Sequence, residues 1–336
     1  MSEKSISRAK EVAAAAAAFF GEPVLGVTAP GGKLRASCRV HFASRDIIVT
    51  RRNDRKQAAL ELAILQRFQT LTDRVPKFLG ATGPFLFQSD AGSNRLNRAI
   101  YAVTADHRID LAAQAVDALF EIQRAAIRSG LVNGQTAANI VPANDDKVLL
   151  SVKHLVEILS CVPTGFDSRK LHPWFKAPAV RFVKWDCRAG NAAIDASGYL
   201  RFFDFEGSRF AHGPEDFAWL IADETWPVPM EIMLGLVRAR LTEADTTDPD
   251  GYMEYLEQFI VLQALRRVRL IFSEAQRAGW LDRITILKYD KVGTNPHLCE
   301  RLCGMAIEIA RRNPATAPLQ VLFERAITAC RKARAA

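Results

Sequence analysis

Three side chains that could serve a metal ion and a proton transfer occur within one short segment. The stretch FVKWDCRAGNAAIDASGYLRFFDFEGS, residues 182–208, contains Asp186, Asn191 and Asp204. Carboxylate and amide oxygens are the ligands that Mg²⁺ prefers, and a carboxylate can accept or orient the proton of a hydroxyl group. Asp and Asn are also frequent in ordinary loops, because their side chains hydrogen-bond the nearby backbone. The residue types alone therefore allow either a metal–nucleotide site or a set of structural turns.

The order of elements around these residues favours the metal–nucleotide site. The pieces NAAI and YLRFFDF read as two strands joined at Asp195-Ala196-Ser197-Gly198, which is typical of a hairpin. Such a hairpin would return the chain so that Asp204 faces the loop that carries Asp186 and Asn191. A helix is expected next, at PEDFAWL, residues 214–220. An Asp and an Asn five positions apart mean little, but the whole ordered series is more specific.

The N-terminal third predicts a small antiparallel sheet with one helix. Apolar or alternating runs bounded by turn residues indicate strands. They are expected at 23–29, 35–43, 47–52 and, on both sides of Gly83-Pro84, within 78–88. The helical spacing of apolar residues predicts a helix over 55–71. The Ala-rich run 12–20 is expected to be an ordinary helix rather than a signal sequence.

The remainder of the chain predicts a mainly helical unit. The polar stretch SDAGSN, 89–94, is the expected linker, so residues 1–91 would form an N-lobe and residues 92–336 a C-lobe of an α+β protein. The acidic segment 242–251 is expected to be a poorly ordered loop. Helices are predicted by apolar periodicity at 111–130, 144–162, 214–223, 228–241, 252–278, 296–312 and 318–334.

Composition narrows the classes of protein. Hydrophobic residues make up 49% and charged residues 24% of the 336 positions, and no apolar run is long enough to span a bilayer, so we expect a cytoplasmic protein with no membrane partner. The net charge of +8 is spread along the chain without a stripe of basic and aromatic residues, which disfavours nucleic-acid binding. None of the six cysteines forms a CxxC pair, which disfavours a zinc site and predicts reduced thiols.

The layout resembles the aminoglycoside phosphotransferase and choline kinase group, relatives of the protein kinases. In that group a loop with Asp, and Asn five residues later, precedes a hairpin that ends in Asp-Phe-Glu or a similar triplet. WDCRAGN and FFDFEGS match this pattern, and PEDFAWL looks like the helix that follows it. The resemblance implies a bilobal protein-kinase-like fold and a phosphotransferase that moves the γ-phosphate of ATP, or of GTP, to a hydroxyl of a small molecule with Mg²⁺.

The same resemblance implies roles for four residues of the segment. Asp186 would accept or orient the proton of the acceptor hydroxyl, and Asn191 and Asp204 would hold Mg²⁺. Asp216 would brace the catalytic loop from the next helix. Phosphoryl transfer fits such a set, because it needs placement of the acceptor and neutralisation of phosphate charge more than covalent help.

The residues that would bind the nucleotide match the pattern of the group less closely. Its third strand usually carries a lysine that pairs with phosphates and with a helix glutamate, whereas this strand reads IIVTRRND. Arg51 is the best substitute, with Glu61 as its partner, and the alternative is an exposed arginine beside a surface glutamate. Backbone amides at Gly31 and Gly32 would approach the phosphates, and Gln88 would lie beside the base.

A second departure lies two residues before Asp186, where the group commonly has a histidine and this chain has Lys184. Lys184 would either stabilise the transferred phosphate or lie on the surface. Together the two departures favour, as an alternative function, a pseudokinase that binds a nucleotide or another ligand without turnover.

The acceptor pocket has two candidate sets of residues, in the C-lobe around 223–230 and 245–252. Acidic side chains there would attract a cationic acceptor, or aromatic side chains would cage a quaternary ammonium group. The aromatic side chains have core packing as their alternative role. The acidic set is Glu215, Asp223 and Glu224, and the aromatic set is Trp226, Tyr252, Tyr255 and Trp280.

Overall fold

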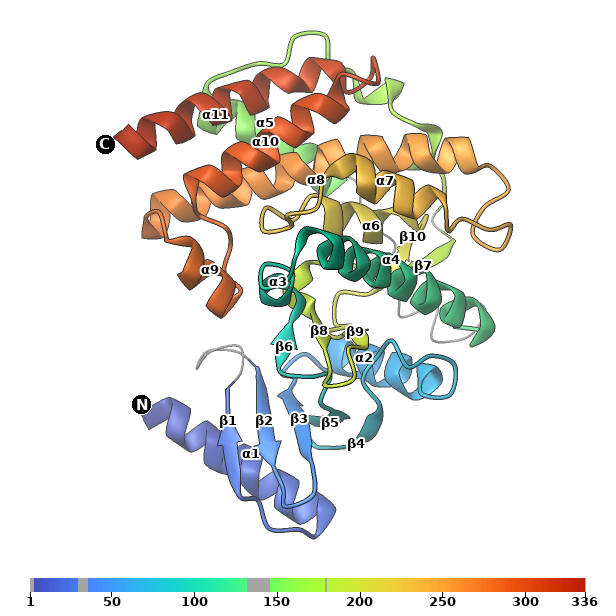
Figure 1. Cartoon of the computed structure of the whole chain (residues 1–336), viewed down its shortest axis with the longest axis vertical. Helices are drawn as coiled ribbons and strands as arrows, with labels where there is room; N and C mark the ends of the chain where they lie inside the picture. Colours follow the sequence, from blue (N-terminus) through green and yellow to red (C-terminus); the bar gives the residue numbers. More distant parts are fainter. Residues whose placement is uncertain (1–2, 30–35, 132–145, 179, 336) are drawn as a thin grey trace.

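A five-stranded antiparallel sheet forms the lower part of the molecule in the computed structural model, which describes residues 3–29, 36–131, 146–178 and 180–335 (Figure 1). The strand order is β1-β2-β3-β5-β4, and every neighbouring pair is antiparallel. The predicted strands of the N-terminal third are therefore confirmed. Their bounds are Gly26–Thr28 (β1), Ser37–His41 (β2), Asp46–Arg51 (β3), Phe78–Thr82 (β4) and Phe85–Ser89 (β5).

Helix α1, Glu3–Phe20, packs across one face of this sheet (Figure 1). Its Val12 and Ala16 are fully buried against the strands, and the ring of Phe19 stacks on that of Phe87 with centroids 4.7 Å apart. Gly80 permits this contact, because a Cβ atom there would lie 2.2 Å from the Phe19 ring. The Ala-rich run is thus a helix, as predicted, and it joins α2 as a second helix of the N-terminal part.

Helix α2, Arg55–Phe68, connects the sheet to the rest of the chain. It begins at Asp54, whose carboxylate accepts hydrogen bonds from the first-turn backbone amides and so caps the helix. At its other end the Phe68 ring meets the rings of Phe182 and Phe205 edge to face, 5.7 and 6.3 Å away. The helix thereby contacts the segment that carries the candidate site residues.

The upper part of the molecule is helical, with the 30-residue α8 at its centre (Figure 1). Helices α5, α6 and α10 pack against α8, and α10 also pairs with α11. Helix α9 was not predicted. The bounds are Leu96–Ala99 (α3), Ala105–Arg128 (α4), Asp146–Leu159 (α5), Pro214–Ile221 (α6), Met230–Arg238 (α7), Pro249–Ala278 (α8), Arg283–Tyr289 (α9), Pro296–Ala310 (α10) and Gln320–Ala335 (α11).

Two small sheets hold the candidate segment between the sheet and the helices. Strand β7, Arg181–Val183, pairs with β10, Arg209–Ala211. The predicted hairpin is confirmed as β8, Ala192–Ile194, and β9, Leu200–Phe202, in the register Ala192↔Phe202. The two-residue strand β6, Asn94–Arg95, extends the hairpin to three strands and includes the last residue of the predicted linker.

The acidic segment 242–251 is ordered, which corrects the sequence prediction. Asp245 is buried and accepts hydrogen bonds from Arg124 and from Thr242. Asp248 then caps α8, which begins at Pro249. The prediction was wrong because the ordering comes from Arg124, which lies 121 residues earlier in the chain.

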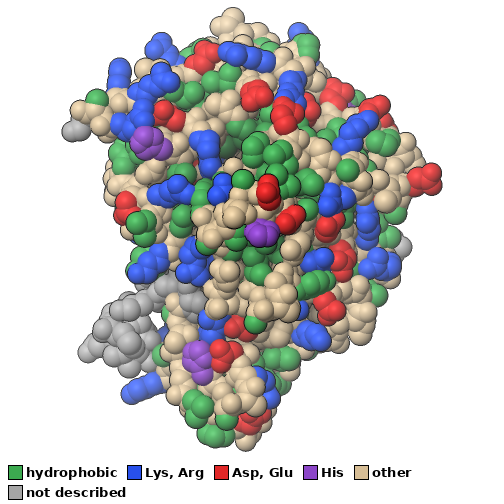
Figure 2. Space-filling model, in the orientation of Figure 1, with side chains coloured by type: hydrophobic (Ala, Val, Ile, Leu, Met, Phe, Trp, Pro, Cys, Tyr) green, Lys and Arg blue, Asp and Glu red, His purple; other side chains and the backbone are tan. Residues whose placement is uncertain are grey.

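Surface and cysteine features agree with the composition. Figure 2 shows acidic and basic side chains interspersed over most of the face in view. All six cysteines are free thiols, and five of them are buried. Among the residues that the structure describes, no helix combines the length and the apolar character needed to cross a membrane.

Candidate active site

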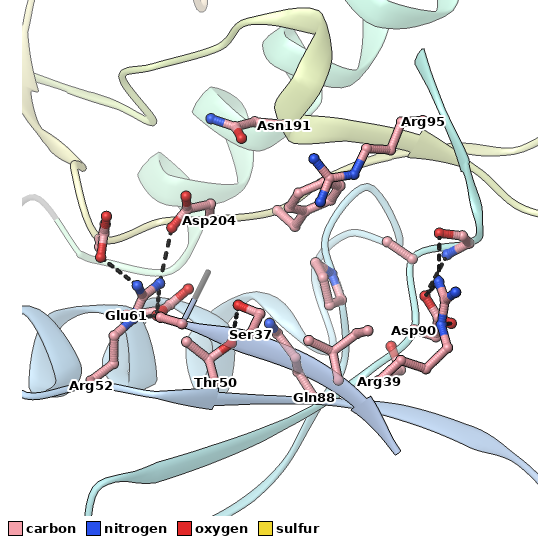
Figure 3. A pocket seen from close by; sticks show the side chains of 18 of the residues that line it. Ser37, Arg39, Thr50, Arg52, Glu61, Gln88, Asp90, Arg95, Asn191 and Asp204 are labelled. Atoms are coloured by element: carbon pink, nitrogen blue, oxygen red, sulfur yellow. Dashed lines mark hydrogen bonds and ion pairs between the residues drawn. The ribbon is translucent and has the colours of Figure 1, made fainter. Parts of the chain in front are cut away.

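A cavity of about 300 Å³ lies between the five-stranded sheet and the β8–β9 hairpin. Figure 3 shows Thr50 and Gln88 reaching into it from the sheet, with Asn191 and Asp204 on the opposite side. The sequence-predicted residues Glu61, Gln88, Asn191 and Asp204 are therefore brought to one cavity. Gly31 and Gly32 lie outside the described residues.

The loop before the hairpin is held in an unusual backbone conformation by Asp216 of α6. Trp185 and Asp186 have φ angles of 61° and 45°, in the left-handed region that non-glycine residues seldom adopt. The buried Asp216 carboxylate accepts hydrogen bonds from the backbone amides of Lys184 and Trp185, 2.9 and 2.7 Å away, and from Gln123 Nε2. Such strain persists only where surrounding contacts over-determine it, and it is frequent at functional sites.

Asp186 projects from this loop and lies beside Arg188 and Asn191. Its carboxylate accepts hydrogen bonds from Arg188 Nε at 2.8 Å and from Asn191 Nδ2 at 2.9 Å. Burial would raise the pKa of Asp186, but the charge and hydrogen bond of Arg188, aided by Lys184 and Arg267, hold it well below its usual range. A carboxylate of this kind can accept a hydrogen bond from a hydroxyl group, but it is a weak base.

Arg188 ties the same loop to the end of α9. Its Nη1 atom contacts Asp290 Oδ1 at 3.3 Å, and both side chains are largely buried. Gly190 makes the close approach possible, because a Cβ atom there would lie 2.0 Å from Asp290 Oδ1. Neither α9 nor Asp290 was predicted to take part in the site.

Asn191 and Asp204 present oxygen atoms that suit a hard cation. The Asn191 amide nitrogen donates hydrogen bonds to the backbone oxygen and the carboxylate of Asp186. The amide oxygen of Asn191 is thus left for another partner. Asp204 has φ 65° and directs its carboxylate toward the cavity (Figure 3). Among the described residues no cluster of three or more His, Cys, Asp or Glu side chains could hold a metal. Mg²⁺ needs fewer protein ligands than that, because it keeps waters and takes phosphate oxygens.

Arg52, and not Arg51, faces the cavity, which corrects the predicted pair. The largely buried Arg52 guanidinium forms ion pairs with Glu61 Oε2 at 2.7 Å and Asp204 Oδ1 at 2.9 Å, and a third with Glu206 (Figure 3). Burial would lower the pKa of Arg52, but the three carboxylates raise it above its usual range. Glu61 is fully buried, so the surface alternative for it is wrong.

Arg51 points elsewhere and contacts Glu11 of α1 across 3.9 Å. The physical reason is the alternation of side chains along a strand. Ile48 and Thr50 of β3 line the cavity, so the residue two positions beyond Thr50 shares their face and Arg51 takes the other. This signal was available in the sequence and identifies Arg52.

Lys184 is neither on the surface nor among the residues that line the cavity. Its side chain is fully buried, and Nζ donates to the backbone oxygens of Asp204 at 3.0 Å and Trp185 at 3.5 Å. The ammonium also lies over the rings of Phe202 and Phe205. Both predicted roles of Lys184 are therefore replaced by a structural link between the catalytic loop and the Asp-Phe-Glu turn.

Gln88 lines the cavity, as predicted, whereas the contact of Arg39 with the linker was not foreseen. Gln88 is buried and its Oε1 atom has no hydrogen-bond partner among the described residues. Arg39 of β2 pairs with Asp90 of the linker at 2.5 Å and also donates to Gly92 O. The sheet is thus fastened to the linker at the edge of the cavity, a contact between residues 51 positions apart that local patterns do not reveal.

The predicted acidic attractors of a cationic acceptor are enclosed in the protein interior. Glu215 accepts from the backbone amides of His212 and Gly213, Asp223 from those of Ala189 and Thr225, and Glu224 binds Arg267. Each is at most 4% exposed. Trp226, Tyr252 and Tyr255 are likewise core residues, and Trp280 packs against Phe272. The three acids are thus occupied by structural partners, and Trp226, Tyr252 and Tyr255 are buried in the core.

The structure has a protein-kinase-like fold, in which the segment around the β8–β9 hairpin lies across a cavity from the five-stranded sheet. Solved structures confirm that this is the fold of the aminoglycoside phosphotransferases. No family model matches the sequence, and no curated protein matches it.

Three solved structures illustrate the similarity. The GDP complex of aminoglycoside 2'-phosphotransferase-IIIa matches 89% of this chain and 99% of its own, with 15% identity and a TM-score of 0.53. The streptomycin–ATP complex of APH(2")-IIa matches 84% and 96%, with 13% identity and a TM-score of 0.54. A putative aminoglycoside phosphotransferase from Ralstonia eutropha JMP134 matches 95% and 98%, with 12% identity and a TM-score of 0.51. At these identities the comparison establishes the fold.

Proposed function

We propose that the protein is an ATP-dependent phosphotransferase that acts on a hydroxyl group of a small molecule. The observation that carries this proposal is the convergence of Arg52, Asn191 and Asp204 on one cavity, with Asp186 hydrogen-bonded to Asn191 beside it. The nucleotides in the similar structures, GDP in one and ATP in another, support a nucleotide as the occupant of this cavity. GTP is the alternative donor.

Mg²⁺ fits the residues present. Asp204 and Asn191 would hold it, and when bound it would neutralise the charge of the nucleotide phosphates. Arg52 is outnumbered by the three carboxylates around it, and burial together with the Asp204 charge raises the pKa of Glu206. A divalent cation would relieve this excess of negative charge.

The remaining groups have roles that follow from their contacts. Arg52 would exchange its ion pair with Asp204 for one with a nucleotide phosphate. Its hydrogen bond from Nε to Glu61 would remain. Asp186 would exchange a hydrogen bond from Arg188 for one from the acceptor hydroxyl and so align its oxygen. That oxygen then bonds to the γ-phosphorus, the bond to the β,γ-bridging oxygen breaks, and the hydroxyl proton leaves by way of Asp186 to solvent. The products are a phosphate ester and ADP.

A ligand-binding module without turnover is the second candidate. The contact that favours it is the pairing of Arg188 with Asp186, because the carboxylate is already occupied and its low pKa makes it a weak base. A turnover measurement separates the two candidates.

A thermal-shift titration tests nucleotide binding first. We expect ATP or GTP to raise the melting temperature only with Mg²⁺, because a ligand of the folded state stabilises it by mass action. Asp204→Ala should lose the shift, and Asp110→Ala, which removes an exposed carboxylate of α4, should keep it. No shift with either nucleotide would exclude both candidates as nucleotide binders, and a shift without ADP release over a panel of hydroxyl compounds would favour the module.

A further inference from the structure

Three arginines gather beside the catalytic loop, outside the cavity that would hold the nucleotide. Arg209 lies over the ring of Trp185, 4.1 Å from its centre, and Arg266 lies over the ring of Trp219 at 4.4 Å. The two tryptophan rings are themselves 5.6 Å apart. Trp185 immediately precedes Asp186, the residue that would receive the acceptor hydroxyl. Arg269, about one turn beyond Arg266 on α8, completes what we call the arginine cluster.

The arginine cluster has no carboxylate partner among the residues that the structure describes, whereas its neighbours do. Arg267 binds Glu224 through two hydrogen bonds of 2.6 and 2.8 Å. In the cluster, Arg209 donates to the backbone oxygen of Gly207, and the buried Nε atom of Arg269 has no hydrogen-bond partner. Partly buried arginines usually pair with acids, so three without one leave an unbalanced positive charge.

Burial and neighbouring positive charges lower the pKa of Arg266 in the cluster. Its pKa is lowered to about 10 by burial and then by the charge of Arg267, with further lowering from Arg209 and Arg269, while Asp186 raises it. Burial also lowers the pKa of Arg209, with Asp216 acting in the opposite sense. An anion placed among these groups would relieve their mutual repulsion.

The acids that were predicted to attract a cationic acceptor do not balance the charge of the arginine cluster. Glu215, Asp223 and Glu224 are buried and hydrogen-bonded to their own structural partners. The charged groups that lie over the rings of Trp185 and Trp219 are guanidinium groups.

We infer that the acceptor is an anionic hydroxyl compound, with a carboxylate or phosphate group held by Arg209, Arg266 and Arg269 while its hydroxyl reaches Asp186. This inference rests on the proposed phosphotransferase function. Guanidinium groups suit such a ligand, because their planar N–H donors match the two oxygens of a carboxylate or phosphate. A polycationic acceptor would meet like charge at the same place and bind poorly.

A panel of small diols that differ in charge tests the inference. Glycerol is neutral, glycerate and glycerol 3-phosphate are anionic, 3-amino-1,2-propanediol is cationic, and inorganic phosphate lacks the diol. Each is titrated into the protein at constant ionic strength, with and without Mg²⁺ and a non-hydrolysable ATP analogue, and the melting temperature is followed. We expect the Kd of an anionic diol to be at least tenfold lower than that of glycerol or the amine, and lower than that of phosphate. The glycerate and glycerol 3-phosphate arms distinguish a carboxylate from a phosphate.

Variants separate the arginine cluster from general charge effects. Arg266→Gln and Arg269→Gln should each raise the Kd of the anionic diol about tenfold, which is the effect of losing one charge-assisted hydrogen bond. Arg277→Gln removes the same charge from an exposed position on the same helix and should leave the affinity unchanged.

Two results would overturn the inference. One is no preference for the anionic diols, including equal or tighter binding of the amine. The other is an anion response that survives in the Arg266→Gln, Arg269→Gln double variant. The proposed function fails separately: a protein that prefers anionic diols but shows no Mg²⁺-dependent nucleotide shift retains the anion site and loses the phosphotransferase assignment.

Discussion

The buried ammonium of Lys184 donates a hydrogen bond to the backbone carbonyl of Asp204, with 3.0 Å between Nζ and the oxygen. Lys184 belongs to the loop braced by Asp216, and Asp204 belongs to the turn after the hairpin. One side chain thus spans the two segments that would place the acceptor and the metal. This position is where the resembling group commonly has a histidine.

Lys184→Met should impair the site more than the fold. The methionine keeps most of the volume but leaves the Asp204 carbonyl without its donor, at a cost of about 1–3 kcal/mol. We expect weaker Mg²⁺-dependent nucleotide binding and a lower kcat. Lys184→His should recover part of both if a donor at this position is what matters, whereas Lys176→Met, at an exposed site, should behave as wild type. Equal nucleotide affinity in Lys184→Met and wild type would remove the positioning role.

Asp186→Asn should abolish transfer while nucleotide binding is retained. The substitution removes the charge that aligns the hydroxyl but leaves Asn191 and Asp204 in place, and loss of such a group typically costs about 10²–10⁴ in rate. Single-turnover ADP release and a nucleotide Kd measured on the same preparation check this. Turnover near the wild-type rate would mean that another group receives the hydroxyl.

Arg52→Ala should lower both stability and nucleotide affinity. Removing the guanidinium leaves Glu61 buried without its ion-pair partner, and breaking a buried pair in this way costs roughly 3–5 kcal/mol. Arg52→Lys should retain part of the affinity. Urea unfolding and nucleotide titration of Arg52→Ala and Arg51→Ala form the matched comparison, because Arg51 has only a distant contact with Glu11. A larger loss of affinity in Arg51→Ala would restore the original prediction.

Stability should fall in mild acid because of His212. Burial lowers the pKa of His212 to about 4, and its ring stacks on Trp174 with centroids 5.3 Å apart. Because the folded pKa lies below the ordinary value, the folded state favours the neutral ring. The resulting stability is complete above pH 6.5 and is lost as the pH falls toward 4.

Urea unfolding of wild type at pH 7 and pH 5 measures this effect, which should reach up to about 2 kcal/mol for the single group. His212→Phe keeps an aromatic ring beside Trp174 and cannot titrate, so its free energy of unfolding should change less between the two pH values. Identical pH dependence in the two proteins would assign the acid sensitivity to other groups.

Local patterns in the sequence carry much of the fold. The strands of the sheet and the β8–β9 hairpin depend on alternation and on turn residues, which are both local, and they were predicted close to their observed bounds. The order of the site residues could be read for the same reason. The protein-kinase-like fold was inferred from the family resemblance that this order of residues carries.

What could not be predicted depends on contacts between distant residues. Asp245 is ordered by Arg124, and the linker is fastened by Arg39 through Asp90. Lys184 gave no signal, because a buried lysine is rare and its acceptors are backbone atoms. The choice of Arg51 over Arg52 has a different origin, because the local alternation of side chains along the strand already distinguishes the two faces.

Helix α1 makes the cavity depend on the far side of the sheet. Phe87 meets α1 through Phe19, and the next residue, Gln88, lines the cavity, because successive side chains of β5 point to opposite faces. One face of β5 therefore packs against α1, and the opposite face lines the cavity. A displacement of α1 would therefore shift β5 through the contact of Phe19 with Phe87. The same shift would move Gln88, beside which a nucleotide base would bind.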